Sequence, residues 1–147
     1  MPQDAPEEVN IGLLLYIPYR ALENRVFQAL ADAGYDVTPA QARIFQRIGP
    51  DGSRLTELAE AAQVTKQTAG FLVDQLERAG YVERTRDPSD ARARLVRVAE
   101  RGAATVPISA KIIAEIEAEW AEHIGTRRMA QLRDALTRLR EITDPYR

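Results

Sequence analysis

The chain has 147 residues, a formal net charge of −2 and no cysteine. This length predicts one domain spanning residues 1–147. Without cysteine there can be no disulfide, no thiolate metal site and no thiol-based sensing of oxidants. The sequence has neither an apolar run of about 18 residues nor a charged-then-apolar leader, which predicts a cytoplasmic protein with no membrane partner.

The first third of the chain predicts two helices. Residues 9–33 carry apolar side chains at near-helical spacing, and Pro18 is expected to kink or divide this long helix because it lacks a backbone N–H. Gly34 closes it. A second helix is expected to begin at Thr38, with Pro39 in its first turn and Gln41 completing a capping box. The turn cluster at residues 49–52 predicts its end.

Residues 55–80 read as two short helices joined by a tight turn at residues 63–64. Thr56 is expected to cap the first helix, which presents a narrow apolar face. Thr65 is expected to cap the second, which ends before Gly80. The predicted buried residues of the two helices are Leu58, Ala59, Ala62, Ala69, Leu72, Val73 and Leu76.

The opposite face of the second short helix carries groups that suit the reading of DNA bases. Gln67 can make paired hydrogen bonds to adenine, Lys66 can reach guanine or phosphate, and the ring of Phe71 can touch a thymine methyl. Gly70 would let the helix sit close to the groove. Any one of these residues alone could equally be a solvated or packed surface residue, whereas the set favours DNA.

A basic hairpin is predicted next. The runs 81–86 and 93–98 have strand-like patterns, and residues 87–92 supply turn formers. Between Arg84 and Arg97 there are five arginines and two aspartates, which gives this segment about +3 in a chain of −2. A helix-turn-helix followed by such a hairpin predicts that one helix enters the major groove with the hairpin beside it.

Residues 55–102 resemble the winged helix-turn-helix of the MarR family of bacterial transcriptional regulators. The residues that carry the resemblance are LTELAEAAQVTKQTAGFLVDQLERAGYVER and DPSDARARLVRVAERG. The resemblance implies a homodimeric regulator, repressor in type, that binds a pseudo-palindromic operator in double-stranded DNA. Ala99 departs from the family pattern, which often has a capping Thr there, and this puts the start of the next helix in doubt.

The resemblance also implies which residues bind DNA. Arg92 would be the minor-groove finger of the hairpin and Asp90 the carboxylate that orients it. The full predicted set is Thr65, Lys66, Gln67, Thr68, Gly70, Phe71, Arg84, Arg86, Asp90, Arg92 and Arg94.

Two further helical stripes follow, separated at Gly125-Thr126, and Pro107 makes the start of the first one irregular. The fold class is therefore expected to be mainly α with a small β-hairpin (α+β). The winged helix-turn-helix part would span residues 36–100, with dimerisation helices at residues 8–34 and 103–143. The dimer comes mainly from the resemblance, because the periodicity alone would equally allow a helical bundle within one chain.

The family resemblance suggests a cleft in which a small aromatic or phenolic effector loosens DNA binding. The residues that could line it are Tyr16, Tyr19, Arg20, Phe45 and Trp120, although Tyr16 and Tyr19 could equally pack with their hydroxyls at a rim. His123 is the only histidine, and no nucleophile elbow or phosphate loop is present. We therefore expect no enzyme, no metal and no cofactor. The alternative function is a winged-helix protein-interaction module that does not bind DNA.

Overall fold

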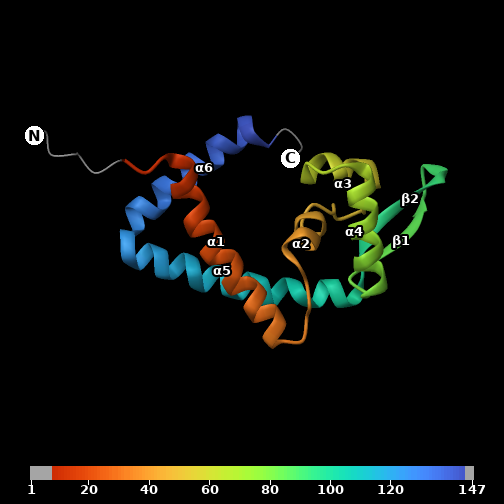
Figure 1. Cartoon of the computed structure of the whole chain (residues 1–147), viewed down its shortest axis with the longest axis horizontal. Helices are drawn as coiled ribbons and strands as arrows, with labels where there is room; N and C mark the ends of the chain where they lie inside the picture. The colour runs from red at the N-terminus through yellow and green to blue at the C-terminus, as the bar shows by residue number, and fades with distance from the viewer. Residues whose placement is uncertain (1–7, 145–147) are drawn as a thin grey trace, which may run out of the picture.

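The computed structural model describes residues 8–144, and the outer parts of the predicted domain, residues 1–7 and 145–147, lie outside the described residues. The molecule is elongated, with a winged part at one end and a helical arm at the other (Figure 1). The mainly α fold with a small hairpin confirms the sequence prediction. The elements in chain order are α1 (Ile11–Asp32), α2 (Pro39–Phe45), α3 (Leu55–Ala62), α4 (Lys66–Arg78), β1 (Val82–Asp87), β2 (Asp90–Val98), α5 (Glu100–Ile124) and α6 (Thr126–Thr143).

The winged part is built from α2, α3, α4 and the β1–β2 hairpin around one apolar core. The face of α4 that was predicted to be buried is buried, and so are Leu58 and Ala59 of α3, while Ala62 is half-buried. Val96 of β2 also exchanges two backbone hydrogen bonds with Ser53, at 2.8 and 3.0 Å, which attaches the segment before α3 to the hairpin. The core residues are Ile44, Leu58, Ala59, Ala69, Leu72, Val73, Leu76, Tyr81, Val82 and Val96.

Capping and turn residues in the sequence predicted most helix ends correctly. The Thr38 capping box with Gln41 is present, Thr65 caps α4, and Gly80 takes a φ of +83° after it. The expected cap at Thr56 is wrong: α3 begins at Leu55, because the Glu57 carboxylate accepts the Arg54 N–H at 3.2 Å and makes Arg54 the cap position. The helix α2 also stops earlier than the turn cluster at 49–52, at Phe45.

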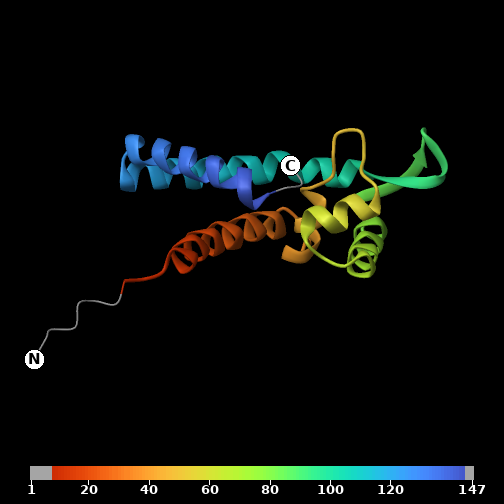
Figure 2. The same cartoon turned by 90° about the horizontal axis from the view of Figure 1, so that it is seen from above.

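The helical arm consists of α5, with α1 packed beside it and α6 turning back from its far end (Figure 2) and rising away from it at an angle (Figure 1). Pro18 does not divide α1, and α5 likewise continues through Pro107. The residues around Pro18 are exposed, so water can replace the backbone donor that the proline lacks. Ala99 offers no side-chain cap, yet α5 begins directly at Glu100, whose negative charge in the first turn suits the positive end of the helix dipole.

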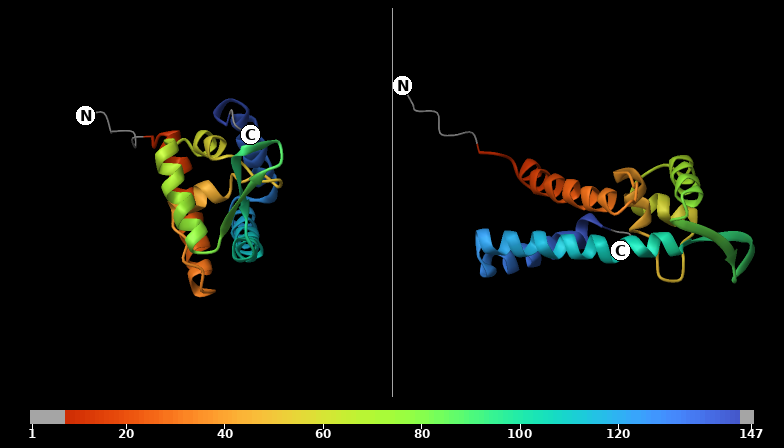
Figure 3. Two further views of the ribbon diagram at one scale, coloured as in Figure 1. Left: turned by 90° about the vertical axis from the view of Figure 1, so that its right-hand side faces the viewer. Right: turned by 90° about the horizontal axis from the view of Figure 1, so that it is seen from below.

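Large apolar faces of the arm have no partner within the described chain. The N-terminal end of α1 diverges from α5 (Figure 3), and its apolar side chains are exposed throughout the first two turns. The helix α6 buries no residue at all, and its Ile142 is 82% exposed. The exposed apolar residues of these two segments are Val9, Ile11, Leu13, Leu14, Leu15, Ile17, Leu132, Leu136, Leu139 and Ile142.

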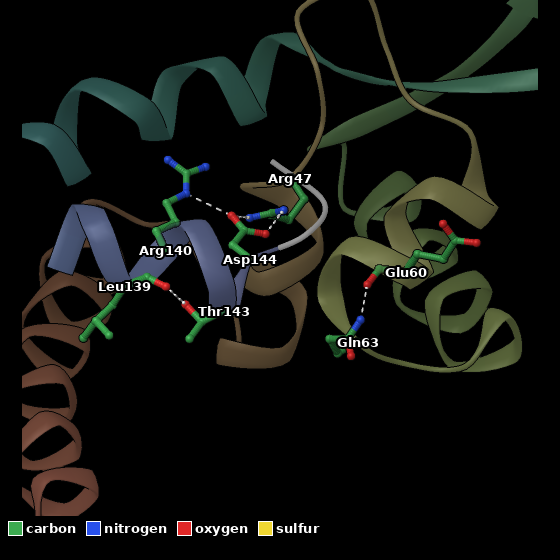
Figure 4. Close-up of polar contacts among 7 residues, drawn as sticks. All are labelled: Arg47, Glu60, Gln63, Leu139, Arg140, Thr143 and Asp144. Carbon is green, nitrogen blue, oxygen red and sulfur yellow. Dashed lines mark hydrogen bonds and ion pairs between the residues drawn. The ribbon is translucent and has the colours of Figure 1, made fainter.

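The end of α6 is tied to the winged part by a carboxylate that two arginines share (Figure 4). Asp144 accepts hydrogen bonds from Arg47, just after α2, at 2.9 and 3.2 Å, and from Arg140 at 2.9 Å. These hydrogen bonds, that of Arg47 first, lower the pKa of Asp144 to about 2. The carboxylate is therefore charged at neutral pH, and the tie holds the last described turn of the arm against the winged part.

The winged part and the arm meet at the start of α5. The Ala99 N–H donates to the Tyr81 carbonyl at 3.0 Å, and Arg101 donates to the Gly34 and Ala79 carbonyls at 3.2 and 3.4 Å. The guanidinium of Arg101 also lies over the rings of Tyr35 and Tyr81, 5.6 and 4.9 Å from their centroids. This junction joins the ends of α1 and α4 to the first turn of α5.

Gly102 allows the junction to close. A Cβ at position 102 would lie 2.2 Å from the Tyr81 carbonyl oxygen and 2.8 Å from Cε2 of Phe45. We therefore predict that Gly102→Ala lowers the free energy of unfolding by at least about 2 kcal/mol, because a backbone atom must move to relieve the overlap. Urea denaturation followed by circular dichroism measures this change.

Gly70→Ala is the matched control, since a Cβ there would meet only Cδ2 of Leu55 at 3.6 Å, an ordinary contact. This substitution is expected to stabilise α4 by about 0.5–1 kcal/mol. Equal unfolding midpoints for the two variants would contradict the close approach at position 102.

Candidate DNA-binding surface

The first turns of α4 present polar side chains to solvent. Thr65, Lys66, Gln67 and Thr68 are all exposed. The Thr65 hydroxyl accepts the Thr68 N–H at 3.1 Å and donates to the Thr68 hydroxyl at 2.9 Å, so these two threonines are engaged with each other. The side chains of Lys66 and Gln67 make no hydrogen bond or ion pair within residues 8–144, which leaves their donors and acceptors available to a ligand.

Phe71 and Gly70 lie one turn further along the same helix. The ring of Phe71 is 58% exposed, which is unusual for a large apolar side chain and leaves it available to a partner. Gly70 is half-buried, and a Cβ built on it points toward Leu55 at the start of α3. The position therefore turns partly toward α3, and its role at a DNA groove stays a prediction.

Two arginines of the hairpin face each other across the strands. Arg86 of β1 is paired with Arg94 of β2, and both are exposed. Because strand residues alternate between faces, this pair shares a face with Val82 and Val96, which pack into the core. Neither guanidinium has an ion pair or hydrogen bond among the described residues. Like charges opposite each other destabilise a hairpin, and an anion bound between them would offset that repulsion.

Arg84 differs from the other predicted arginines because its charge is already compensated. Its guanidinium donates to the Glu77 carboxylate at 2.9 Å and to the Asp74 carboxylate at 2.7 Å, and its backbone N–H donates to Glu77 at 3.0 Å. Only 18% of its side chain is exposed. The structure thus places Arg84 as a brace between α4 and β1, and its contact with DNA stays a prediction.

Arg92 and Asp90 lie at the tip of the hairpin, where both are exposed. The Asp90 carboxylate accepts the backbone N–H of Arg92 at 3.0 Å. The guanidinium of Arg92 makes no hydrogen bond or ion pair with Asp90 or with any other residue that the structure describes. Asp90 therefore orders the backbone that carries Arg92 in this structure, while the predicted orientation of the side chain is absent from it.

Sequence reasoning missed two residues of this surface, Arg54 and Asp87. The guanidinium of Arg54 donates to the Asp87 carboxylate at 2.8 and 3.0 Å, although 33 positions separate the two residues. A sequence pattern could not find this pair, because each residue reads alone as an ordinary surface charge beside a turn. The Asp-Pro-Ser turn at residues 87–89 was the one local signal that marked Asp87.

A mainly apolar cavity of about 420 Å³ lies between the arm and the winged part. Of the predicted effector residues, Tyr19 and Phe45 line it, whereas Tyr16, Arg20 and Trp120 are not among its lining residues. Arg20 instead lies 5.7 Å from the ring centroid of Tyr16. Glu23 and Arg43 add charged groups to the wall, with 3.9 Å between their nearest charged atoms. A hydrogen bond to Glu23 raises the pKa of the Tyr19 hydroxyl, which stays protonated at neutral pH.

These features define a winged helix-turn-helix protein with an exposed polar helix and a basic wing. The MarR family model matches residues 35–93, and no curated protein matches the chain in sequence. A crystal structure of MarR is 28% identical with a TM-score of 0.72, covering 92% of this chain and 98% of that one. The chain is therefore similar to the MarR family of transcriptional regulators, with the family match lying in residues 35–93.

Two further solved structures have the same fold. The transcriptional repressor CouR, bound to a 23-mer DNA duplex, is 25% identical with a TM-score of 0.70, covering 88% of this chain and 92% of that one. The transcriptional regulator Tm0710 from Thermotoga maritima is 26% identical with a TM-score of 0.63, covering 89% of this chain and 92% of that one. The proteins that this chain resembles are thus transcriptional regulators and not enzymes. None of the helices within residues 8–144 is long and apolar enough to cross a membrane.

Tyr81 leads to a stability prediction at the cavity wall. This side chain is 2% exposed, and its hydroxyl is buried without a hydrogen-bond partner among the described residues. A buried polar group without a partner costs about 1–3 kcal/mol. We predict that Tyr81→Phe removes this cost and raises the free energy of unfolding, measured by urea denaturation.

Tyr81→Leu serves as the control, because it removes the hydroxyl together with the ring that Arg101 covers. It is expected to destabilise the protein. A loss of stability in Tyr81→Phe would show that the hydroxyl has a partner in solution.

Proposed function

We propose that this protein is a transcriptional regulator of repressor type that binds double-stranded DNA in a sequence-specific manner. The α4 helix would enter a major groove, and the hairpin arginines would lie over the adjoining minor groove. The observation that carries the proposal is the set of partner-free donors: Lys66 and Gln67 on α4, with Arg86 and Arg94 opposed on the hairpin. The similarity to CouR, which was solved bound to a DNA duplex and is 25% identical, supports DNA as the partner.

The net charge of −2 does not argue against this function. Phosphates respond to charges within a Debye length of about 8–10 Å, so the local excess of arginine on the hairpin decides the interaction. In the described structure two carboxylates of α4 compensate the charge of Arg84. Arg86, Arg92 and Arg94 have no carboxylate partner there. Three uncompensated arginines on one hairpin are an electrostatic footprint for a polyanion.

We propose further that the protein acts as a homodimer on a pseudo-palindromic operator. The apolar faces of α1 and α6 lie in the segments 8–34 and 103–143 that the sequence assigned to dimerisation. A second copy on a two-fold axis would cover both faces and present two winged parts, residues 36–100, to two half-sites. Sedimentation equilibrium decides this point, since a single species with the 16.4 kDa mass of one chain would contradict the dimer.

The cavity supports release by a small effector. Its size and apolar wall suit an aromatic or phenolic molecule, and its lining comes from both the arm and the winged part. Such a ligand would shift the angle between them and weaken DNA binding. The test is a screen of phenolic compounds against the protein–DNA complex, with Ala110→Phe, which would place a ring in the cavity, as a variant that should respond less.

Gln67 is predicted to specify sequence, because an amide can make paired hydrogen bonds to one base. We expect Gln67→Ala to weaken binding to a selected operator by about 1–3 kcal/mol while scarcely changing binding to a scrambled duplex. Lys66→Ala is the matched comparison and should weaken both duplexes about equally if the ammonium meets phosphate. Paired titrations at one salt concentration measure the two losses.

Equal losses of affinity on both duplexes for Gln67→Ala would show that Gln67 contacts only the DNA backbone. No loss on either would move base reading to Phe71 or Thr68. If the wild-type protein binds no duplex even at low salt, the result would instead favour a protein-interaction module.

Arg92 is predicted to contact DNA through its charge. We expect Arg92→Ala to weaken binding and to lower the slope of log affinity against log salt by roughly one unit, because one fewer counterion is released. Fluorescence anisotropy over a series of salt concentrations gives the slope. Glu83→Gln, at an exposed position on β1 without a hydrogen-bond partner in the described structure, is the control on the same hairpin. An unchanged affinity and slope for Arg92→Ala would remove it from the interface.

A further inference from the structure

Asp87 is a buried carboxylate in an otherwise exposed hairpin tip. Its side chain is 6% exposed, whereas Pro88, Ser89 and Asp90 beside it are exposed. The carboxylate accepts the Ser89 hydroxyl and the Ser89 N–H at 2.7 and 2.8 Å on one oxygen. The other oxygen accepts Nε and Nη2 of Arg54. These bonds, led by those from Ser89, lower the pKa of Asp87, so the carboxylate is charged at neutral pH.

Asp87 therefore joins two structures that are distant in sequence. Through Ser89 it closes the two-residue turn of the hairpin, at the bulge that separates Arg86 from Asp87 in the strand register. Through Arg54 it is fixed to the cap residue of α3. The neighbouring residue Ser53 is bridged to Val96, so the segment 53–54 holds both strands of the hairpin.

The hairpin is also held from its other side. Arg84 binds Asp74 and Glu77 of α4. The hairpin is thus fastened to α3 near its tip and to α4 near its base. The exposed Arg86, Arg92 and Arg94 lie on the part of the hairpin that the Asp87 anchor orders.

We propose that Asp87 is a positioning residue for DNA binding, which holds the hairpin arginines at a fixed place relative to α4 before DNA arrives. This inference rests on the proposed function, because it concerns the same surface. A hairpin that is already ordered in the free protein loses little conformational entropy on binding. Asp87 contributes by fixing Ser89 and Arg54, and it makes no contact with DNA itself.

An electrostatic role and a positioning role of Asp87 predict opposite changes in DNA affinity when its charge is removed. Asp87→Asn raises the charge between positions 84 and 97 from about +3 to about +4 and frees Arg54 to meet phosphate. If charge alone mattered, the variant would bind DNA more tightly. If Asp87 positions the hairpin, the variant binds more weakly despite the added positive charge.

The test measures DNA affinity of full-length Asp87→Asn and wild type by fluorescence anisotropy over a salt series. We expect about five- to tenfold weaker binding, the size of the ordering cost of one or two side chains at an interface, with the salt slope preserved because the hairpin arginines remain. Hydrogen exchange in the free protein should quicken at residues 88–95 while the core amides stay protected. A variant that merely unfolds would lose protection throughout.

Two further variants complete the experiment. Glu83→Gln removes a negative charge from the same hairpin without touching the anchor and should bind as tightly as wild type or more so. Ser89→Ala deletes only the hydroxyl donor and should weaken DNA binding by a smaller factor. This variant provides the test if Asp87→Asn does not fold. Binding of Asp87→Asn, or of Ser89→Ala in that case, at wild-type strength or above would overturn the inference. Failure of the wild-type protein to bind DNA would overturn the proposed function instead.

Discussion

The contact between the start of α5 and the backbone of Tyr81 sets the relation between the two halves of the molecule. Gly102 lets the helix approach the Tyr81 carbonyl, the Ala99 N–H donates to that same carbonyl, and Arg101 covers the Tyr81 ring. Because α5 is one rigid rod of 25 residues, a small rotation at this point is amplified along the arm. The placement of the winged part in any assembly of the arms therefore depends on how tightly this junction is packed.

The surface proposed to bind DNA contains a hairpin held in place by ion pairs and arginines that have no carboxylate partner. Arg84, Arg54 and Asp87 are paired with other residues of the chain and brace the hairpin, while Arg86, Arg92 and Arg94 keep guanidinium groups that meet no carboxylate in the described structure. The sequence presents the hairpin arginines as one basic run and gives no sign that Arg54 and Asp87 act with them. Their division into bracing and exposed residues comes from tertiary contacts with α3 and α4, which bring carboxylates to some arginines and not to others.

Much of the fold was predictable because its signals are local. The caps at Thr38 and Thr65, the stop at Gly80 and the break at Gly125 each depend on residues within one turn. The start of α3 was misplaced because Glu57 reached back past Thr56 to the Arg54 N–H. Pro18 was expected to kink or divide the helix, and the division is wrong because one missing donor does not outweigh a long run of helix formers in an exposed helix. Two ion pairs could not be predicted, because each joins charges that lie far apart in the chain: Arg54–Asp87 and Arg47–Asp144.

The cavity beside the junction has walls from both halves: Tyr19 and Val26 belong to α1, Ala42 and Phe45 to α2, and Leu76 to α4. Its shape therefore depends on the angle between the arm and the winged part. By thermodynamic linkage, any occupant that weakens DNA binding through this angle must itself be bound more weakly by the same factor once DNA is held. The DNA-bound protein would then respond to its ligand at a higher concentration than the free protein, so the number of DNA sites in a cell would enter into the ligand threshold.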